Sequence, residues 1–163
     1  MKEKEFLEIY KDLIESKNFD SALTICEQFI SDNPESFEGY RKRAYLYSRS
    51  NEFENAISDI SEAIRLNPMN STYYFFRGWW KIESGDFVGG ETDVTVAIDL
   101  DRDSNLLSDT AYFFRSLARV ELGRNEDAIA DLRNVESDFM IHLKRFGKIS
   151  REELLKRATK CAD

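Results

Sequence analysis

The chain has 163 residues, of which 42% are hydrophobic and 33% charged, and its formal net charge is −8 at pH 7. This negative charge argues against a nucleic-acid partner, because phosphate binding normally needs a basic face. The charged N-terminus, the wide separation of Cys26 and Cys161, and the lack of any run of roughly 20 apolar residues predict a reduced, cytoplasmic protein without a membrane segment.

Four repeats follow one another along the chain, and each is predicted to form two short helices. They span residues 3–36, 37–70, 71–104 and 109–141, with residues 105–108 as an insertion before the last. In the first helix of three repeats an aromatic residue stands four positions before a small one, as in the pairs Tyr40 and Ala44, Tyr74 and Gly78, Tyr112 and Ser116. The second helices carry a small residue where helices cross closely, at Ala22, Ala56, Gly90 and Ala128.

This pattern resembles the tetratricopeptide repeat, whose 34-residue period adds Gly, Ala and Pro landmarks that are matched here by Gly85, Ala56 and Pro68. The resemblance implies an all-α fold, a right-handed superhelical stack of about four helix-turn-helix units around a concave groove. Residues 1–163 would then form a single domain. The sequence departs from the family pattern where Arg102 replaces the closing proline of the third repeat, and in the less regular second helix of the fourth.

An arginine and an aspartate lie 16 residues apart in each of the last three repeats. The pairs are Arg43 and Asp59, Arg77 and Asp93, and Arg115 and Asp131. The same positions of the first repeat hold Ile9 and Ile25, so the two sites change together. We therefore expect an ion pair between the two helices of each of these repeats, partly desolvated, where losing one partner costs roughly 3–5 kcal/mol.

The chain after the fourth repeat is predicted to interrupt the helical pattern and then resume it. Residues 139–146 mix apolar and basic side chains, and residues 141–163 hold seven Lys or Arg against three Asp or Glu, so an acidic body ends in a basic tail. Ser150 and Glu153 have the spacing of a capping box, which predicts a capping helix over residues 150–161 with Leu154, Ala158 and Cys161 on one face. Such a helix covers the apolar face that a stack leaves at its end.

The reactive residues are not arranged for catalysis. His142 lies among apolar residues without a nucleophile at a recognisable spacing, and Cys26 is interpreted as a small core residue. The acidic run of residues 99–105 begins like a calcium loop, but Ser104 replaces the turn glycine and Thr110 the closing glutamate. We therefore expect no enzymatic activity, no cofactor and no metal.

The resemblance implies that first helices line the groove, and seven side chains there are predicted to bind another protein or peptide: Arg41, Tyr45, Phe75, Trp79, Ile82, Phe113 and Leu117. Trp, Tyr and Arg are the usual anchors of protein interfaces. Two alternatives stay open. Tight stacking, or folding of residues 139–161 into the groove, would make the same aromatic residues core, and a second copy of the chain would form a homodimer there.

Two functional classes are compatible with these features. Residues 109–155 resemble small bacterial tetratricopeptide proteins that act as immunity partners of secreted toxins, which implies occlusion of a basic catalytic face by an acidic body. The alternative is a secretion-type chaperone or scaffold that binds an apolar peptide segment in its groove. An adaptor for chaperone tails is disfavoured, because Phe75, Phe76 and Trp79 stand where a two-carboxylate clamp needs Lys and Asn.

Overall fold

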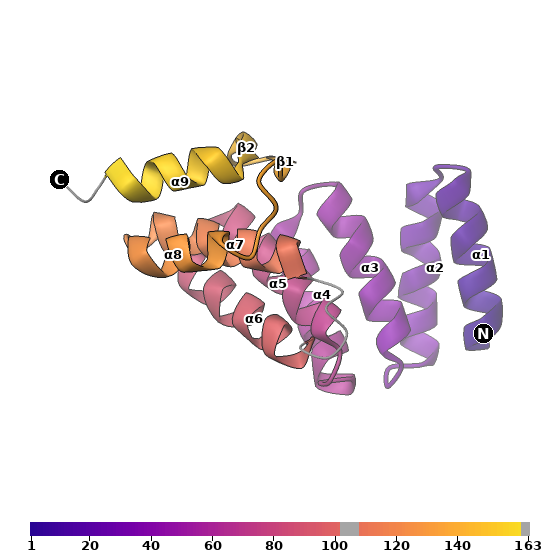
Figure 1. The fold of residues 1–163 in the computed structure, drawn as a ribbon. Coiled ribbons are helices and arrows are strands. Elements are labelled where there is room, and N and C mark those ends of the chain that lie inside the picture. The colour runs from indigo at the N-terminus through magenta and orange to yellow at the C-terminus, as the bar shows by residue number, and fades with distance from the viewer. Residues whose placement is uncertain (102–107, 161–163) are drawn as a thin grey trace. The chain divides into compact units, whose positions relative to one another are not determined.

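The computed structural model describes residues 1–101 and 108–160, and Figure 1 shows their helices and strands. Contacts group the chain into an N-terminal unit, Met1–Met69, and a C-terminal unit, Asn70–Asp163. The N-terminal unit holds α1 (Glu3–Glu15), α2 (Phe19–Asp32), α3 (Phe37–Arg49) and α4 (Phe53–Leu66). The C-terminal unit holds α5 (Ser71–Ser84), α6 (Phe87–Leu100), α7 (Ser108–Glu121), α8 (Asn125–Leu132), β1 (Met140–Leu143), β2 (Gly147–Ser150) and α9 (Arg151–Lys160). The predicted fold of stacked helical repeats with a C-terminal helix is confirmed.

The turn inside every repeat has the same backbone conformation. Lys17, Asn51, Gly85 and Gly123 stand at the same repeat position and all have a positive φ, from 58° to 97°. The N–H of each bonds to the carbonyl three residues earlier, and the next N–H reaches back five residues, for example from Asp86 to Lys81 at 2.8 Å. These bonds satisfy carbonyls that a helix end leaves unpaired. The repeat is thus set by local backbone bonding as well as by its apolar positions.

Each unit has its own apolar core. In the N-terminal unit the rings of Phe6 and Phe29 stack with centroids 4.1 Å apart, and Tyr10, Ala22, Cys26 and Leu46 complete that cluster. In the C-terminal unit, α5 and α6 cross at glycines. A Cβ on Gly78 would lie 2.7 Å from Cγ2 of Val94, and one on Gly90 would lie 2.5 Å from Cγ1 of Ile82. The close helix crossing expected at Gly90 is therefore present, and larger residues would push the helices apart.

The segment after α8 corrects the sequence prediction. The fourth repeat was expected to continue to residue 141, but α8 ends at Leu132 and an antiparallel β-hairpin follows, with Met140 opposite Ser150 and Leu143 opposite Gly147. Three residues form its turn, and Gly147 takes the left-handed conformation that such turns need. A signal was present in the sequence, because apolar residues alternate at 141, 143 and 149 around the glycine.

The last helix begins as the capping box predicts. The Ser150 hydroxyl accepts a hydrogen bond from the Glu153 N–H at 3.2 Å, and α9 buries Leu154 and Ala158. The helix lies beside α7 and α8 (Figure 1). Cys161, predicted for the same face, lies outside the described residues. Among the residues that the structure describes, none of the helices combines the length and the apolar character that a bilayer crossing demands.

Candidate protein-binding faces

The three arginine–aspartate pairs lie between the helices of their repeats. Each guanidinium donates two hydrogen bonds to one carboxylate, at 2.7 and 2.8 Å from Arg43 to Asp59, at 2.8 and 2.7 Å from Arg77 to Asp93, and at 2.9 and 2.7 Å from Arg115 to Asp131. All three aspartates are buried. The hydrogen bond to Asp59 raises the pKa of Arg43 above its usual range. These bidentate pairs fix the mutual orientation of the two helices of a repeat.

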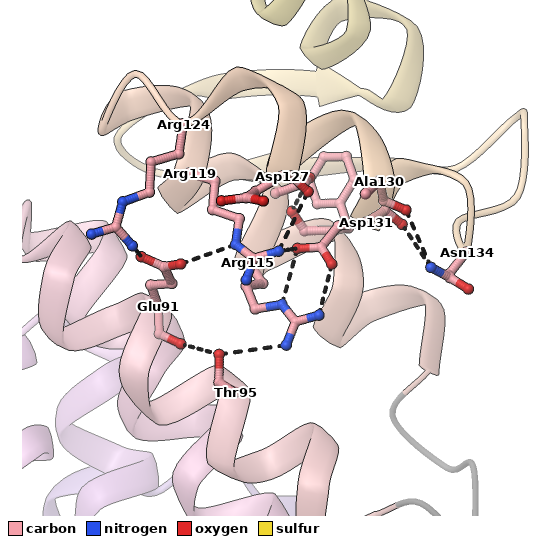
Figure 2. Close-up of polar contacts among 11 residues, drawn as sticks. Glu91, Thr95, Arg115, Arg119, Arg124, Asp127, Ala130, Asp131 and Asn134 are labelled. Carbon is pink, nitrogen blue, oxygen red and sulfur yellow. Dashed lines mark hydrogen bonds and ion pairs between the residues drawn. The ribbon is translucent and has the colours of Figure 1, made fainter.

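In the C-terminal unit the last pair belongs to a larger network, shown in Figure 2. Asp131 also accepts from Arg119 at 2.8 Å, and Arg119 donates to Glu91 at 2.9 Å. Glu91 in turn accepts from Arg124 at 2.6 Å. The network joins α6, α7 and α8, and each of these charged groups has an opposite charge beside it. These ion pairs therefore link the three helices to one another.

The seven predicted groove residues divide between surface and core. In α3, Tyr45 is 42% exposed and Arg41 is partly exposed. In the C-terminal unit, Trp79 is half-buried and four residues are buried: Phe75, Ile82, Phe113 and Leu117. In this conformation these four belong to the apolar core of the C-terminal unit, and their binding to a partner stays a prediction.

The cover over these residues comes from the chain itself. We name residues 139–160 the strap, and the set Phe75, Trp79, Ile82, Phe113 and Leu117 the α5–α7 face. The Phe139 ring lies 4.8 Å from that of Phe113, and Leu143, Ile149 and Leu154 share one core cluster with the face. Both alternatives raised from the sequence thus apply: Phe75 packs on Phe114 within the helix stack, with ring centroids 5.6 Å apart, and the tail folds onto Phe113.

A buried carboxylate holds the turn of the strap. Glu83 in α5 is 7% exposed and accepts hydrogen bonds from the backbone N–H groups of Lys144 at 3.0 Å and Arg145 at 2.8 Å. The Arg145 guanidinium also lies over the Phe87 ring, 5.6 Å from its centroid. Glu83 could not be found from the sequence, because Lys144 and Arg145 lie 61 and 62 positions after it. No periodic pattern links them to it.

In the N-terminal unit the equivalent positions of α3 carry a different surface. The Arg49 guanidinium lies 4.7 Å from the Phe19 ring centroid and 5.8 Å from that of Tyr45, and it donates to the Tyr45 hydroxyl at 3.2 Å. Arg41 donates to Glu38 one turn earlier. We name Arg41, Tyr45 and Arg49 the α3 face. Arg49 was missed from the sequence, although it stands four residues after Tyr45 on the same side of the helix.

Comparisons with known proteins agree with this architecture. The model of the tetratricopeptide repeat family matches residues 38–70. Residues 38–70 thus match a tetratricopeptide repeat, and the chain shares the fold of solved tetratricopeptide-repeat structures. Among solved structures, MamA matches with a TM-score of 0.73 at 18% identity over 80% of this chain and 69% of that one. The Arabidopsis OM64 TPR domain matches with 0.63 at 29% identity, over 78% and 98%. The TPR2B domain of yeast Sti1, in its pHsp70 complex, matches with 0.67 at 18%, over 72% and 96%. A comparison with curated proteins finds no match.

Its tetratricopeptide repeats make the chain a protein–protein interaction module. Among the described residues, no group of three or more His, Cys, Asp or Glu side chains is placed to hold a metal ion. His142 is exposed on β1. The acidic run of residues 99–105, considered for calcium, lies largely outside the described residues. The side chains predicted to bind a partner lie on the α3 face and on the α5–α7 face under the strap.

Cys26 in the first repeat is expected to resist thiol reagents. It is fully buried, and burial raises the pKa of its thiol to about 12. The reactive thiolate is thus scarce at pH 8. In a Cys161→Ser background, labelling by a disulfide reagent should proceed no faster than unfolding, and urea should accelerate it. Rapid labelling of the native protein would contradict the burial of this thiol.

The same burial predicts a pH dependence of stability. Because the unfolded thiol ionises near pH 8.5, the free energy of unfolding should fall as pH rises above that value.

Proposed function

We propose that this chain is an inhibitor that binds a folded partner protein through the α3 face and blocks it by occlusion. The observation that carries the proposal is the contrast between equivalent positions. Tyr45 is 42% exposed, whereas Leu117, at the same position of the last repeat, is fully buried. The α3 face therefore stays accessible within its own unit while the matching positions of the C-terminal unit are already occupied.

The chemistry of the α3 face suits a protein interface. Tyrosine and arginine supply large contact areas, and alanine scans find them among the dominant contributors to binding. Arg49 is restrained by the Phe19 and Tyr45 rings, so less side-chain freedom is lost when a partner docks. The pairing of Arg41 with Glu38 reduces the local positive charge. The face thus offers shape and hydrogen-bond donors on a chain whose charge is negative.

The net charge of −8 favours a basic partner, such as a toxin with a nucleic-acid-cleaving face. Opposite charges steer encounter over distances of about 10 Å at moderate salt, and they raise the association rate more than the final affinity. An inhibitor of this kind needs no catalytic group. It covers the partner's active surface for as long as the complex lasts.

A secretion-type chaperone remains the second candidate. It would bind an extended apolar segment on the aromatic residues of the C-terminal unit. The strap already packs on those residues, which supports the inhibitor over the chaperone. A chaperone would also respond weakly to salt, because its contacts would be mainly apolar.

The test uses the protein encoded by the neighbouring gene as the binding probe. We expect Tyr45→Ala and Arg49→Ala each to raise the dissociation constant of the complex at least tenfold, as measured by calorimetry, because each removes an anchor of the α3 face. Affinity should also fall between 50 and 300 mM salt. The matched controls are Val88→Ala, which is 59% exposed on α6, and Arg65→Ala, whose guanidinium pairs with Glu62 on exposed α4 surface. Equal losses in test and control variants, or binding only of the denatured probe, would contradict the proposal.

A further inference from the structure

We propose that the α5–α7 face is a second partner-binding site, which the strap occupies in the free chain and which an apolar turn of the partner takes by displacing the strap. This inference rests on the proposed function for the existence of a partner. It adds a site in the C-terminal unit and the chemistry of the segment that fits it.

The first support is the way in which Glu83 recognises the strap. The buried Glu83 carboxylate accepts hydrogen bonds from two adjacent backbone N–H groups, at 3.0 and 2.8 Å. Backbone groups are common to all sequences, so Glu83 selects a turn that offers two free N–H groups and not a particular side chain. Charge-assisted bonds of this kind are strong where water is excluded. Any turn of suitable shape can therefore compete for it.

The second support is that the strap attaches mostly through side chains placed along its length. Phe139 contacts Phe113, Phe146 contacts Phe87 with centroids 6.3 Å apart, and Arg157 reaches Glu121 at 3.5 Å. The strap contains most of residues 141–163, which hold seven basic against three acidic residues, and it lies on a chain that is acidic elsewhere. These are the contacts of a bound ligand: aromatic anchors, a held turn and complementary charge.

The third support is a donor that the strap leaves unused. The Trp79 indole N–H is enclosed and has no hydrogen-bond acceptor among the described residues. The Trp79 ring itself is half-buried, on the same side of α5 as Phe75, with the Phe114 ring centroid 5.3 Å away. A buried unpaired donor costs free energy until an acceptor arrives. The partner segment is therefore expected to bring a carbonyl or hydroxyl oxygen to Trp79, which the strap does not do.

Hydrogen exchange tests whether the strap can leave. By NMR, we expect the Lys144 and Arg145 amides of the wild-type protein to exchange through an opening that leaves the α7 amides protected. Glu83→Gln should accelerate these two amides by about ten- to hundredfold, the effect of losing charge-assisted hydrogen bonds. Glu126→Gln is the matched control, because it removes the same charge from an exposed side chain of α8, and it should change them less than about fivefold. Exchange of strap and α7 amides only together, by global unfolding, would overturn the proposal.

A synthetic peptide of residues 137–151 tests whether the uncovered face binds in trans. Phe139→Ala weakens the strap but keeps the face intact, so a larger fraction of molecules is open and the apparent dissociation constant should fall about tenfold below that of wild type. Adding Glu83→Gln should abolish this gain, since the peptide uses the same anchor. Equal peptide binding by wild type and the Phe139→Ala variant would overturn the proposal, provided that the α7 amides of the variant remain protected.

Trp79→Phe separates this inference from the proposed function. The variant keeps an aromatic ring and removes the N–H, so the binding of the synthetic peptide should not change, whereas the neighbouring gene's product should bind several-fold more weakly. If that protein binds with a dependence on Tyr45 but not on Trp79 or Phe139, the proposed function stands and the second site does not. If it does not bind at all, strap opening and peptide binding still decide the present inference.

Discussion

Replacing Asp131 with alanine is expected to destabilise the C-terminal unit by about 3–5 kcal/mol. The Asp131 side chain is 4% exposed and accepts from both Arg115 and Arg119, which are themselves mostly enclosed. Without the carboxylate, Arg115 loses both hydrogen bonds of its pair and keeps its charge in a largely enclosed place, with the Thr95 hydroxyl 3.4 Å away. Removing one partner of a buried pair costs more than the pair itself contributes.

The measurement is urea unfolding followed by tryptophan fluorescence. Both tryptophans, Trp79 and Trp80, lie in α5, so the signal reports the C-terminal unit. The control is a pair of variants in the N-terminal unit, followed by circular dichroism. Asp59→Leu alone should be strongly destabilising, and its combination with Arg43→Met should recover most of the loss, because no uncompensated charge remains. A loss below about 1 kcal/mol for Asp131→Ala would show that the network is effectively hydrated.

Local periodicity accounts for what the sequence could predict of the fold. Every repeat places its aromatic, small and turn residues at fixed intervals, and neighbouring helices contact each other, so spacing alone located the helix pairs and the partners 16 residues apart. The turn position shows the same logic. Gly85 and Gly123 favour a left-handed backbone, and the structure assigns it to Lys17 and Asn51 as well, because the helix-end hydrogen bonds require it there.

The non-periodic part was the part that sequence reasoning could not place. The strap begins with a single hairpin whose strands are four residues each, too short for a firm alternation signal. The strap docks on Glu83 and Phe113, which lie far away in the chain. The position of Glu83 is held by Glu15 in the first repeat, and that of Phe113 by Arg41 in the second. Repeat position alone therefore indicates where a side chain points, but not whether another segment covers it.

Leu117 and Tyr45 occupy equivalent positions in two repeats, but only Leu117 is buried. Leu117→Ala should lower the free energy of unfolding by about 2–5 kcal/mol, because it opens a cavity in the packed core of the C-terminal unit. Tyr45→Ala, nine residues into its own repeat as Leu117 is, should change it by less than about 0.5 kcal/mol, since its ring is 42% exposed.

The two variants therefore exchange their ranks between assays. Urea unfolding, read by fluorescence for Leu117→Ala and by circular dichroism for Tyr45→Ala, should rank Leu117 first, whereas calorimetry with the neighbouring gene's product should rank Tyr45 first. If Leu117→Ala were tolerated as well as Tyr45→Ala, the strap would not pack on α7 in solution, and the α5–α7 face would be open from the start. The aromatic residues of α5 and α7 would then be the principal binding surface, and the extended-peptide chaperone would displace the inhibitor as the better account of the chain.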